Sequence, residues 1–186
     1  MNAENQEILT KLQSMSCSRE ELLKFRADAK VRWLQGELEA EKILDVIDQI
    51  KPTDDFTVFM GFCPYGLLEN RLDIQWKMQN ICTFDFQASE IQIRRFNKIF
   101  SGDLVILKKR EVFAVSMRLY GFGRVDKVQT DQSGSRKLLM KWSHQREEIV
   151  VPLMGCNSTV NVKSRAQVGG EMPAHYFDWL DSAKSA

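Results

Sequence analysis

The sequence predicts an α+β protein in which a helical N-terminal segment precedes a β-rich domain. Two observations support this prediction. Apolar residues among the first fifty positions recur with the three-to-four-residue period of helices. After Lys51-Pro52-Thr53-Asp54-Asp55 the chain changes to short runs of strand-forming residues separated by turn signals. We therefore expect a helical segment over residues 1–52 and a compact β-rich domain over residues 53–186.

The helical segment begins its second helix at a recognisable signal. Ser18-Arg19-Glu20-Glu21 is a capping-box pattern, because the Ser18 side chain can accept from the Glu21 backbone while the Glu21 side chain reaches back. Gly36 weakens any continuous helix beyond it. A further apolar stripe runs from Leu38 to Ile50. Such stripes can cover one edge of the β-rich domain or join two copies of the chain, so a homodimer through these helices is one expectation.

The β-rich domain shows a series of short predicted strands. A helix is predicted before them at Ser89–Phe100, closed by Gly102, and a short C-terminal helix at Met172–Ala183. Gly121-Phe122-Gly123 is interpreted as a bend or bulge between two strands, and Leu67 to Phe86 has no clear period. Short strands at this spacing favour a small, mostly antiparallel barrel or sandwich. The predicted strands are Phe56–Phe62, Asp103–Lys109, Val112–Tyr120, Arg124–Gln129, Lys137–Trp142, Glu148–Pro152 and Thr159–Val162.

The composition places the chain among globular proteins. Apolar residues make up 44% of it, which is enough for a buried core. No stretch approaches the roughly 20 apolar residues that cross a bilayer, so no contact with a membrane is expected. The first residues contain neither the basic region nor the apolar stretch of a secretory signal. The sequence therefore predicts a cytoplasmic protein.

The residues that could carry catalysis or bind a metal are sparse. Four cysteines and two histidines are too far apart for the ligand spacing of a zinc site, so neither a metal nor a cofactor is expected. No serine lies in a Gly-x-Ser-x-Gly turn, and no catalytic residue is predicted. A hydrolase or transferase that uses Cys156 or a serine stays open as an alternative. It requires His144 or His175 within hydrogen-bond reach of the nucleophile.

The net charge of +1 conceals an uneven distribution. Residues 1–50 contain 7 basic and 10 acidic side chains, and residues 51–186 contain the other 19 basic and 15 acidic ones. Residues 94–146 contain 13 basic side chains and only 4 acidic ones, which gives this segment a net charge of +9. A block of this charge is expected to attract an anionic partner.

Nucleic acid is the anionic partner that this block fits best. Phosphates require cations spread over neighbouring elements, and aromatic residues between them offer faces on which bases can stack. The alternative is that these lysines and arginines protect strand edges while the rings form the core. The cations predicted to contact phosphates are Arg94, Arg95, Lys108, Lys109, Arg118, Arg124 and Lys141.

Two segments of the chain resemble a known superfamily. In Phe100–Leu107 a helix leads through Gly102-Asp103 into an apolar strand, and Tyr120–Val125 precedes a hairpin that ends at Met140-Lys141-Trp142. This arrangement is similar to the PUA-like superfamily of pseudobarrels, particularly its EVE, ASCH and YTH branches, over about residues 56–180. The resemblance implies a PUA-like, mostly antiparallel β-barrel on which the helical segment packs.

The same resemblance implies that the protein binds DNA or RNA, with a modified or flipped base in an aromatic-lined pocket. The residues that it places at this pocket are Phe62, Tyr65, Trp76, Ser89, Tyr120, Trp142 and Asn157. A second hypothesis is a non-catalytic protein-interaction or regulatory subunit, for example of a restriction or defence system. It would act through the acidic helices and the surface near Gly155–Thr159.

Overall fold

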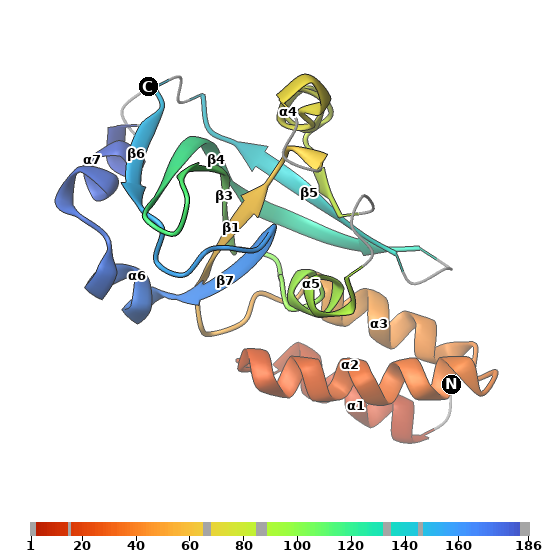
Figure 1. The fold of residues 1–186 in the computed structure, drawn as a ribbon. Helices are drawn as coiled ribbons and strands as arrows, with labels where there is room; N and C mark the ends of the chain where they lie inside the picture. The colour runs from red at the N-terminus through yellow and green to blue at the C-terminus, as the bar shows by residue number, and fades with distance from the viewer. Residues whose placement is uncertain are drawn as a thin grey trace.

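The structure is a computed structural model that describes residues 3–14, 16–64, 68–84, 89–131, 135–144 and 147–182. These residues form a mixed α+β fold in which three N-terminal helices lie beneath a curved sheet (Figure 1). The N-terminal helices are α1 (Ala3–Ser14), α2 (Arg19–Leu34) and α3 (Glu39–Gln49). The strands are β1 (Phe56–Gly61), β2 (Ile81–Thr83), β3 (Leu104–Val112), β4 (Ser116–Thr130), β5 (Arg136–Trp142), β6 (Ile149–Pro152) and β7 (Val160–Ser164). The remaining elements are the 3-10 turn η2 (Leu68–Asn70) and the helices α4 (Asp73–Gln79), α5 (Glu90–Phe96), α6 (Arg165–Glu171) and α7 (Ala174–Ser182).

The sheet is mostly antiparallel, as the sequence predicts. Its strand order is β2-β5-β4-β3-β1-β7, and β6 pairs with β4. Only the pair β1–β3 is parallel among the described strands. The path is open, with β2 at one end and β7 at the other. The described strands therefore form an open sheet, and the closure of the predicted barrel is not seen among them.

Several elements differ from their predicted bounds. The predicted strands Val112–Tyr120 and Arg124–Gln129 are one strand, β4, because the pairing with β3 shifts register at Tyr120 instead of ending there. Gly121 lies at this shift with φ +145°. The aperiodic stretch after Leu67 contains α4 and β2, which are too short to show a period. Helix α6 was not predicted, although Ser164 and Gln167 form a capping box that begins it.

Each face of the sheet packs against a buried cluster over part of its area. On one face, residues such as Val58, Leu107 and Leu138 form a buried cluster with Trp76 of α4 and Phe96 of α5. On the other face, a second cluster contains Tyr176 and Trp179 of α7, among others. A third cluster fills the space among the N-terminal helices. Within the described residues, no helix has the length and apolar character needed to cross a membrane.

Buried ion pairs connect the helical segment to the sheet. Ser18 caps α2 as predicted, accepting from the Glu21 backbone at 3.3 Å. The next residue, Arg19, is buried and donates to both oxygens of Asp103 at 2.6 and 2.8 Å. Its guanidinium also packs 4.0 Å from the Phe56 ring. Because Asp103 precedes β3 directly, this pair fixes α2 against the start of the central strands.

Candidate nucleic-acid interface

The seven cations that the sequence assigns to phosphates do not share one surface. The register of the sheet and the helix positions divide them into four groups. Side chains directly opposite in an antiparallel pair point to the same face of the sheet, so two of the groups are cross-strand pairs. The groups are Lys109 with Arg118, Arg124 with Lys141, Lys108 alone, and Arg94 with Arg95 on α5.

Lys108 lies in the interior, and its predicted contact with phosphate is wrong. Its side chain is buried, and Nζ donates to the carbonyl oxygens of Cys156 and Ser158 at 2.6 and 2.7 Å. Burial lowers the pKa of this ammonium to about 8. The predicted strand ended at Lys109, whereas β3 continues to Val112. Lys108 is therefore a mid-strand residue that fastens the loop between β6 and β7.

Arg94 and Arg95 lie on α5, away from the long strands. Arg94 is exposed and has Glu90 one turn earlier, with 3.8 Å between the charged groups. Arg95 donates to the carbonyl oxygen of Val160 at 3.2 Å. Arg95 thus contributes to the packing of α5 on β7.

The pair Lys109–Arg118 lies among carboxylates. Arg118 donates two hydrogen bonds to Glu111, at 2.9 and 2.7 Å, and its Nη1 lies 3.8 Å from Glu148. The hydrogen bonds to Glu111 raise the pKa of Arg118. The neighbouring Arg71 is likewise bound by both oxygens of Asp73. Arg118 and Arg71 are therefore neutralised by carboxylates, whereas Lys109 forms no ion pair with a described residue.

Arg124 and Lys141 belong to a larger cationic surface. Lys141 is opposite Arg124 in the register of β4 and β5, Lys127 is opposite Leu139, and Lys137 is opposite Gln129. Leu138 and Met140 point into the core, so the alternating residues Lys137, Leu139 and Lys141 point to the other face. The four cations on that face are all exposed. We call them the β4–β5 cation face: Arg124, Lys127, Lys137 and Lys141.

The β4–β5 cation face carries more charge than its neighbours neutralise. Lys141 contacts Asp126 at 2.5 Å, and Arg124 donates to the carbonyl oxygen of Gly102 at 3.1 Å. Lys127 and Lys137 form no ion pair with any residue that the structure describes. Like charges directly opposite each other, as in Arg124 and Lys141, destabilise a strand pair. The face thus keeps an electrostatic cost that packing does not explain.

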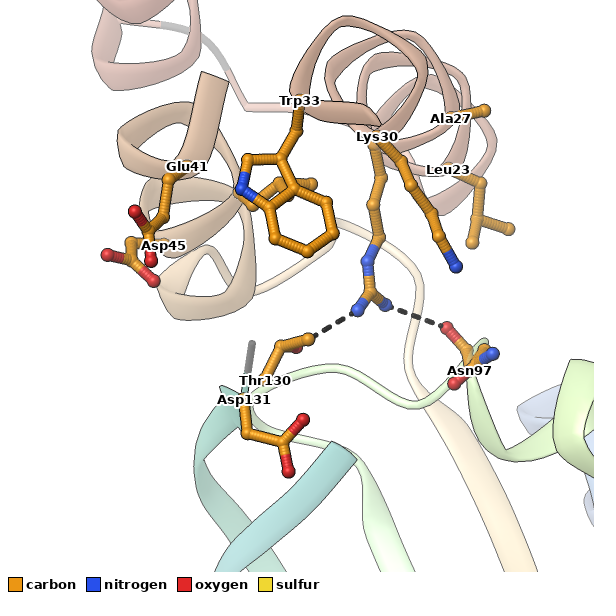
Figure 2. A pocket seen from close by; sticks show the side chains of 11 residues that line it. Leu23, Ala27, Lys30, Trp33, Glu41, Asp45, Asn97, Thr130 and Asp131 are labelled. Atoms are coloured by element: carbon orange, nitrogen blue, oxygen red, sulfur yellow. Dashed lines mark hydrogen bonds between the residues drawn. The ribbon is translucent and has the colours of Figure 1, made fainter. Parts of the chain in front are cut away.

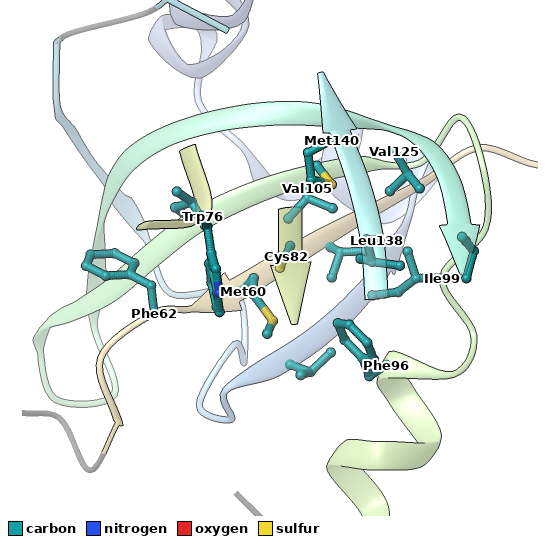
Figure 3. Close-up of a cluster of buried hydrophobic side chains, with 14 residues drawn as sticks. Met60, Phe62, Trp76, Cys82, Phe96, Ile99, Val105, Val125, Leu138 and Met140 are labelled. Carbon is teal, nitrogen blue, oxygen red and sulfur yellow. The ribbon is translucent and has the colours of Figure 1, made fainter. Parts of the chain in front are cut away.

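The aromatic residues assigned to a base pocket are largely core residues. Phe62 and Trp76 are buried in the cluster that Figure 3 shows, so their predicted place in an open pocket is wrong. Trp142 is half-buried and donates from Nε1 to the carbonyl oxygen of Trp76 at 3.1 Å. Tyr120 is half-buried against Phe62, with 4.8 Å between the ring centroids. The four rings lie close together, but they pack in and against the buried core instead of lining an open pocket.

The other residues assigned to that pocket lie apart. Ser89 is the exposed N-cap residue of α5, and Asn157 is exposed in the loop before β7. Neither belongs to the cluster of Trp76. Tyr65 lies outside the described residues.

The geometry gives no support to a cysteine nucleophile. Cys156 is buried, and burial raises the pKa of its thiol. His175 Nε2 lies 3.2 Å from the carbonyl oxygen of Val150, and His144 is exposed after β5. Among the described residues, no three side chains of the types that bind metals gather into a site.

A pocket of about 250 Å³, which sequence reasoning missed, lies between α2, α3 and the end of β4 (Figure 2). Its α2 wall consists of residues that recur every three or four positions, which is the signal that could have identified it. Arg26 crosses the pocket and donates to the carbonyl oxygen of Asn97 at 3.2 Å and to Thr130 at 3.1 Å. The lining residues are Leu23, Arg26, Ala27, Lys30, Trp33, Glu41, Leu44, Asp45, Asn97, Thr130 and Asp131.

Carboxylates gather along one side of this pocket. Glu41 and Asp45 are one turn apart on α3, and Figure 2 shows them together, on the other side of Trp33 from Lys30. Desolvation and the neighbouring carboxylates of Glu41 and Asp48 raise the pKa of Asp45. Asp131 adds a carboxylate from the end of β4, and its Oδ1 accepts from the Ser135 backbone at 3.0 Å. The pocket therefore offers acceptors on α3 and an ammonium on α2.

Comparison with models of known protein families gives no match, and comparison with curated proteins gives none either.

Proposed function

We propose that the protein binds nucleic acid through the β4–β5 cation face. The observation that carries this proposal is the register of β4 and β5, which aligns four exposed cations, of which only Lys141 forms an ion pair with a described residue, Asp126. Lys137 and Lys141 are four residues apart, or about 13 Å along the strand. A duplex carries one phosphate per strand for about every 3.4 Å of its axis, so a face of this length can meet several phosphates.

Protection of strand edges does not account for all of these cations. Lysines often guard the edge strands of sheets against pairing with other chains. Here β3 pairs with β4 as far as Arg124, and β2 pairs with β5 from Lys137 to Leu139, so Arg124 and Lys137 have partner strands on both sides. Among the described strands, Lys127 and Lys141 have a partner on one side only. Arg124 and Lys137 therefore lie on an interior part of the sheet, where edge protection does not require a cation.

The resemblance to PUA-like pseudobarrels supports the same proposal. Its sequence segments correspond to the residues that follow α5, the turn at Gly102 with φ +88°, and the strands β3, β4 and β5. A PUA-like fold and its nucleic-acid-binding role are part of what we propose, and the open, mostly antiparallel sheet is compatible with them.

The test is a titration of the full chain with fluorescent single- and double-stranded DNA and RNA. Lys127→Glu/Lys137→Glu should weaken binding about tenfold or more near 50 mM salt, because two phosphate contacts become repulsive. The matched control is Lys24→Glu/Arg165→Glu, which changes the net charge equally at exposed positions on α2 and α6. Equal affinities for the two double variants would overturn the proposal.

Self-association is a second candidate, favoured by one observation. Val31, Leu34 and Leu38 near the α2–α3 turn are 53%, 69% and 79% exposed, and exposed apolar patches often mark protein interfaces. Light scattering should show a dimer that Leu34→Gln/Leu38→Gln converts to a monomer. A monomeric wild-type protein would exclude this candidate without affecting the first.

A further inference from the structure

The pocket between α2, α3 and the end of β4 is large enough for a small molecule with one or two rings, but not for a drug-sized ligand. Its volume of about 250 Å³ is below the roughly 300–1,000 Å³ of sites for drug-sized molecules. The half-buried ring of Trp33 forms one wall, with the apolar side chains of Leu23, Ala27 and Leu44 beside it. An aromatic wall next to aliphatic side chains favours a planar ring system.

The polar groups of the pocket limit which kinds of ring-containing ligand it can bind. Glu41 and Asp45 offer carboxylate oxygens from α3, whereas Lys30 offers an ammonium from the opposite side of Trp33 (Figure 2). A phosphate or carboxylate ligand would meet repulsion from Glu41, Asp45 and Asp131. A simple cation would meet repulsion from Arg26 and Lys30. A ring that carries both a donor amino group and an acceptor atom complements the two sides together.

The position of the pocket links it to the β4–β5 cation face. Gln129, opposite Lys137, directly precedes Thr130, and Thr130 and Asp131 both line the pocket. On β4 the last cation of the face, Lys127, is three residues before Thr130, and on β5 Lys137 directly follows Arg136, the partner of Thr130. Thr130 and Gln129 point to opposite faces of the sheet, so the cation face and the pocket meet across the end of β4. A strand whose phosphates lie on that face can reach this opening by passing around the end of β4.

We infer that the pocket binds one unstacked base with an exocyclic amino group, such as cytosine, from a single strand held on the β4–β5 cation face. This inference rests on the proposed function. Trp33 stacks on the base, and Glu41 and Asp45 accept from its amino group, as carboxylates accept from the cytosine amino group elsewhere. Uracil and thymine lack that amino group, so the pocket discriminates against them.

The test compares oligo(dC) with oligo(dT), each of about 12 nucleotides, because both are pyrimidine strands with equal phosphate charge. The wild-type protein should bind oligo(dC) about tenfold more tightly, as expected for one such pair. Glu41→Gln/Asp45→Asn should remove this preference by weakening oligo(dC) binding alone. Asp28→Asn, an exposed position on α2 outside the pocket lining, is the matched control and should keep the preference.

Substitutions of Trp33 provide a second, independent test of base binding in the pocket. Trp33→Ala should weaken oligo(dC) binding about tenfold, and Trp33→Phe should retain most of it, since either ring can stack. Circular dichroism confirms folding, and the Phe variant keeps the test decisive if the Ala variant unfolds.

The outcomes separate the inference from the proposed function. If no strand binds, or if Lys127→Glu/Lys137→Glu has no effect, the proposed function fails. If strands bind through those lysines but oligo(dC) and oligo(dT) bind equally, the inference alone is overturned. It is also overturned if folded Glu41→Gln/Asp45→Asn keeps the wild-type preference.

Discussion

Two regions of this protein use the same residue types in opposite ways. At the junction of the helices with the sheet, Arg19 and Arg136 are buried, and each donates to a buried aspartate, Asp103 and Asp48. On the β4–β5 cation face, the lysines and arginine are exposed, and only Lys141 pairs with a described carboxylate, Asp126. Burial of a charge requires a partner, whereas an exposed cation requires none and stays available to a ligand.

The comparison shows why counting charges along the chain overestimates a binding surface. The block 94–146 has a net charge of +9, but Arg136 and Lys108 in it are buried with intramolecular partners. Arg118 is held by two hydrogen bonds to Glu111. Burial and pairing, rather than composition, decide which cations can meet an anion.

The largest expected effect on the free energy of unfolding is at the junction of the helices with the sheet. Asp103→Asn should lower the free energy of unfolding by about 3–5 kcal/mol, because it leaves the buried Arg19 guanidinium without its main counter-charge. Urea denaturation followed by circular dichroism measures this change. Asp126→Asn, on the exposed cation face, is the matched control and should change the free energy by less than about 1 kcal/mol. Similar losses for both variants would contradict the distinction between the two regions.

A pH-dependent effect should follow from Lys108. Its pKa is about 8 in the folded protein and about 10.4 when unfolded. Between these values the unfolded chain binds more protons, so the contribution of Lys108 to the free energy of unfolding rises with pH, by up to roughly 3 kcal/mol. It is constant below about pH 8.

Lys108→Met removes this titration and should also destabilise the protein, because the carbonyl oxygens of Cys156 and Ser158 lose their donor. The measurement is urea denaturation of both proteins at ~pH 7.5, 9 and 10.5. The difference in unfolding free energy between wild type and variant should grow with pH. A difference independent of pH would show that Lys108 is not a buried ammonium.

The sequence predicted the helical segment and most strands, because their periods and turn signals are local. The Ser18 capping box and the C-terminal helix are confirmed. Helix α4 and strand β2 were missed because seven and three residues show too little of a period. The continuity of β4 was missed because a register shift at Tyr120 is a property of the pairing with β3, which sequence patterns do not reveal.

The candidate site was harder to predict than the fold. Arg124 and Lys141 were identified from charge, but their alignment with Lys127 and Lys137 depends on the cross-strand register. Lys108 was assigned to the surface because its strand was expected to end there. The pocket beside Trp33 combines three segments that are distant in sequence, so local reasoning could not assemble it.

The smallest expected effect on stability is at the cation face. Lys127→Gln/Lys137→Gln should change the free energy of unfolding by no more than about 0.5 kcal/mol, because exposed side chains without ion pairs contribute little. Both side chains are exposed. A loss of several kcal/mol in urea denaturation would instead indicate that these lysines are structural.

The salt dependence of nucleic-acid binding tests the central claim most directly. The dissociation constant for a single strand is measured from about 50 to 200 mM salt for wild type, Lys127→Gln/Lys137→Gln and Arg118→Gln. The plot of log Kd against log salt should lose about 1.4 of its slope in the double variant, or about 0.7 for each lost phosphate contact, and keep its slope in Arg118→Gln. Equal slopes for wild type and the double variant would show that the β4–β5 cation face does not contact phosphates.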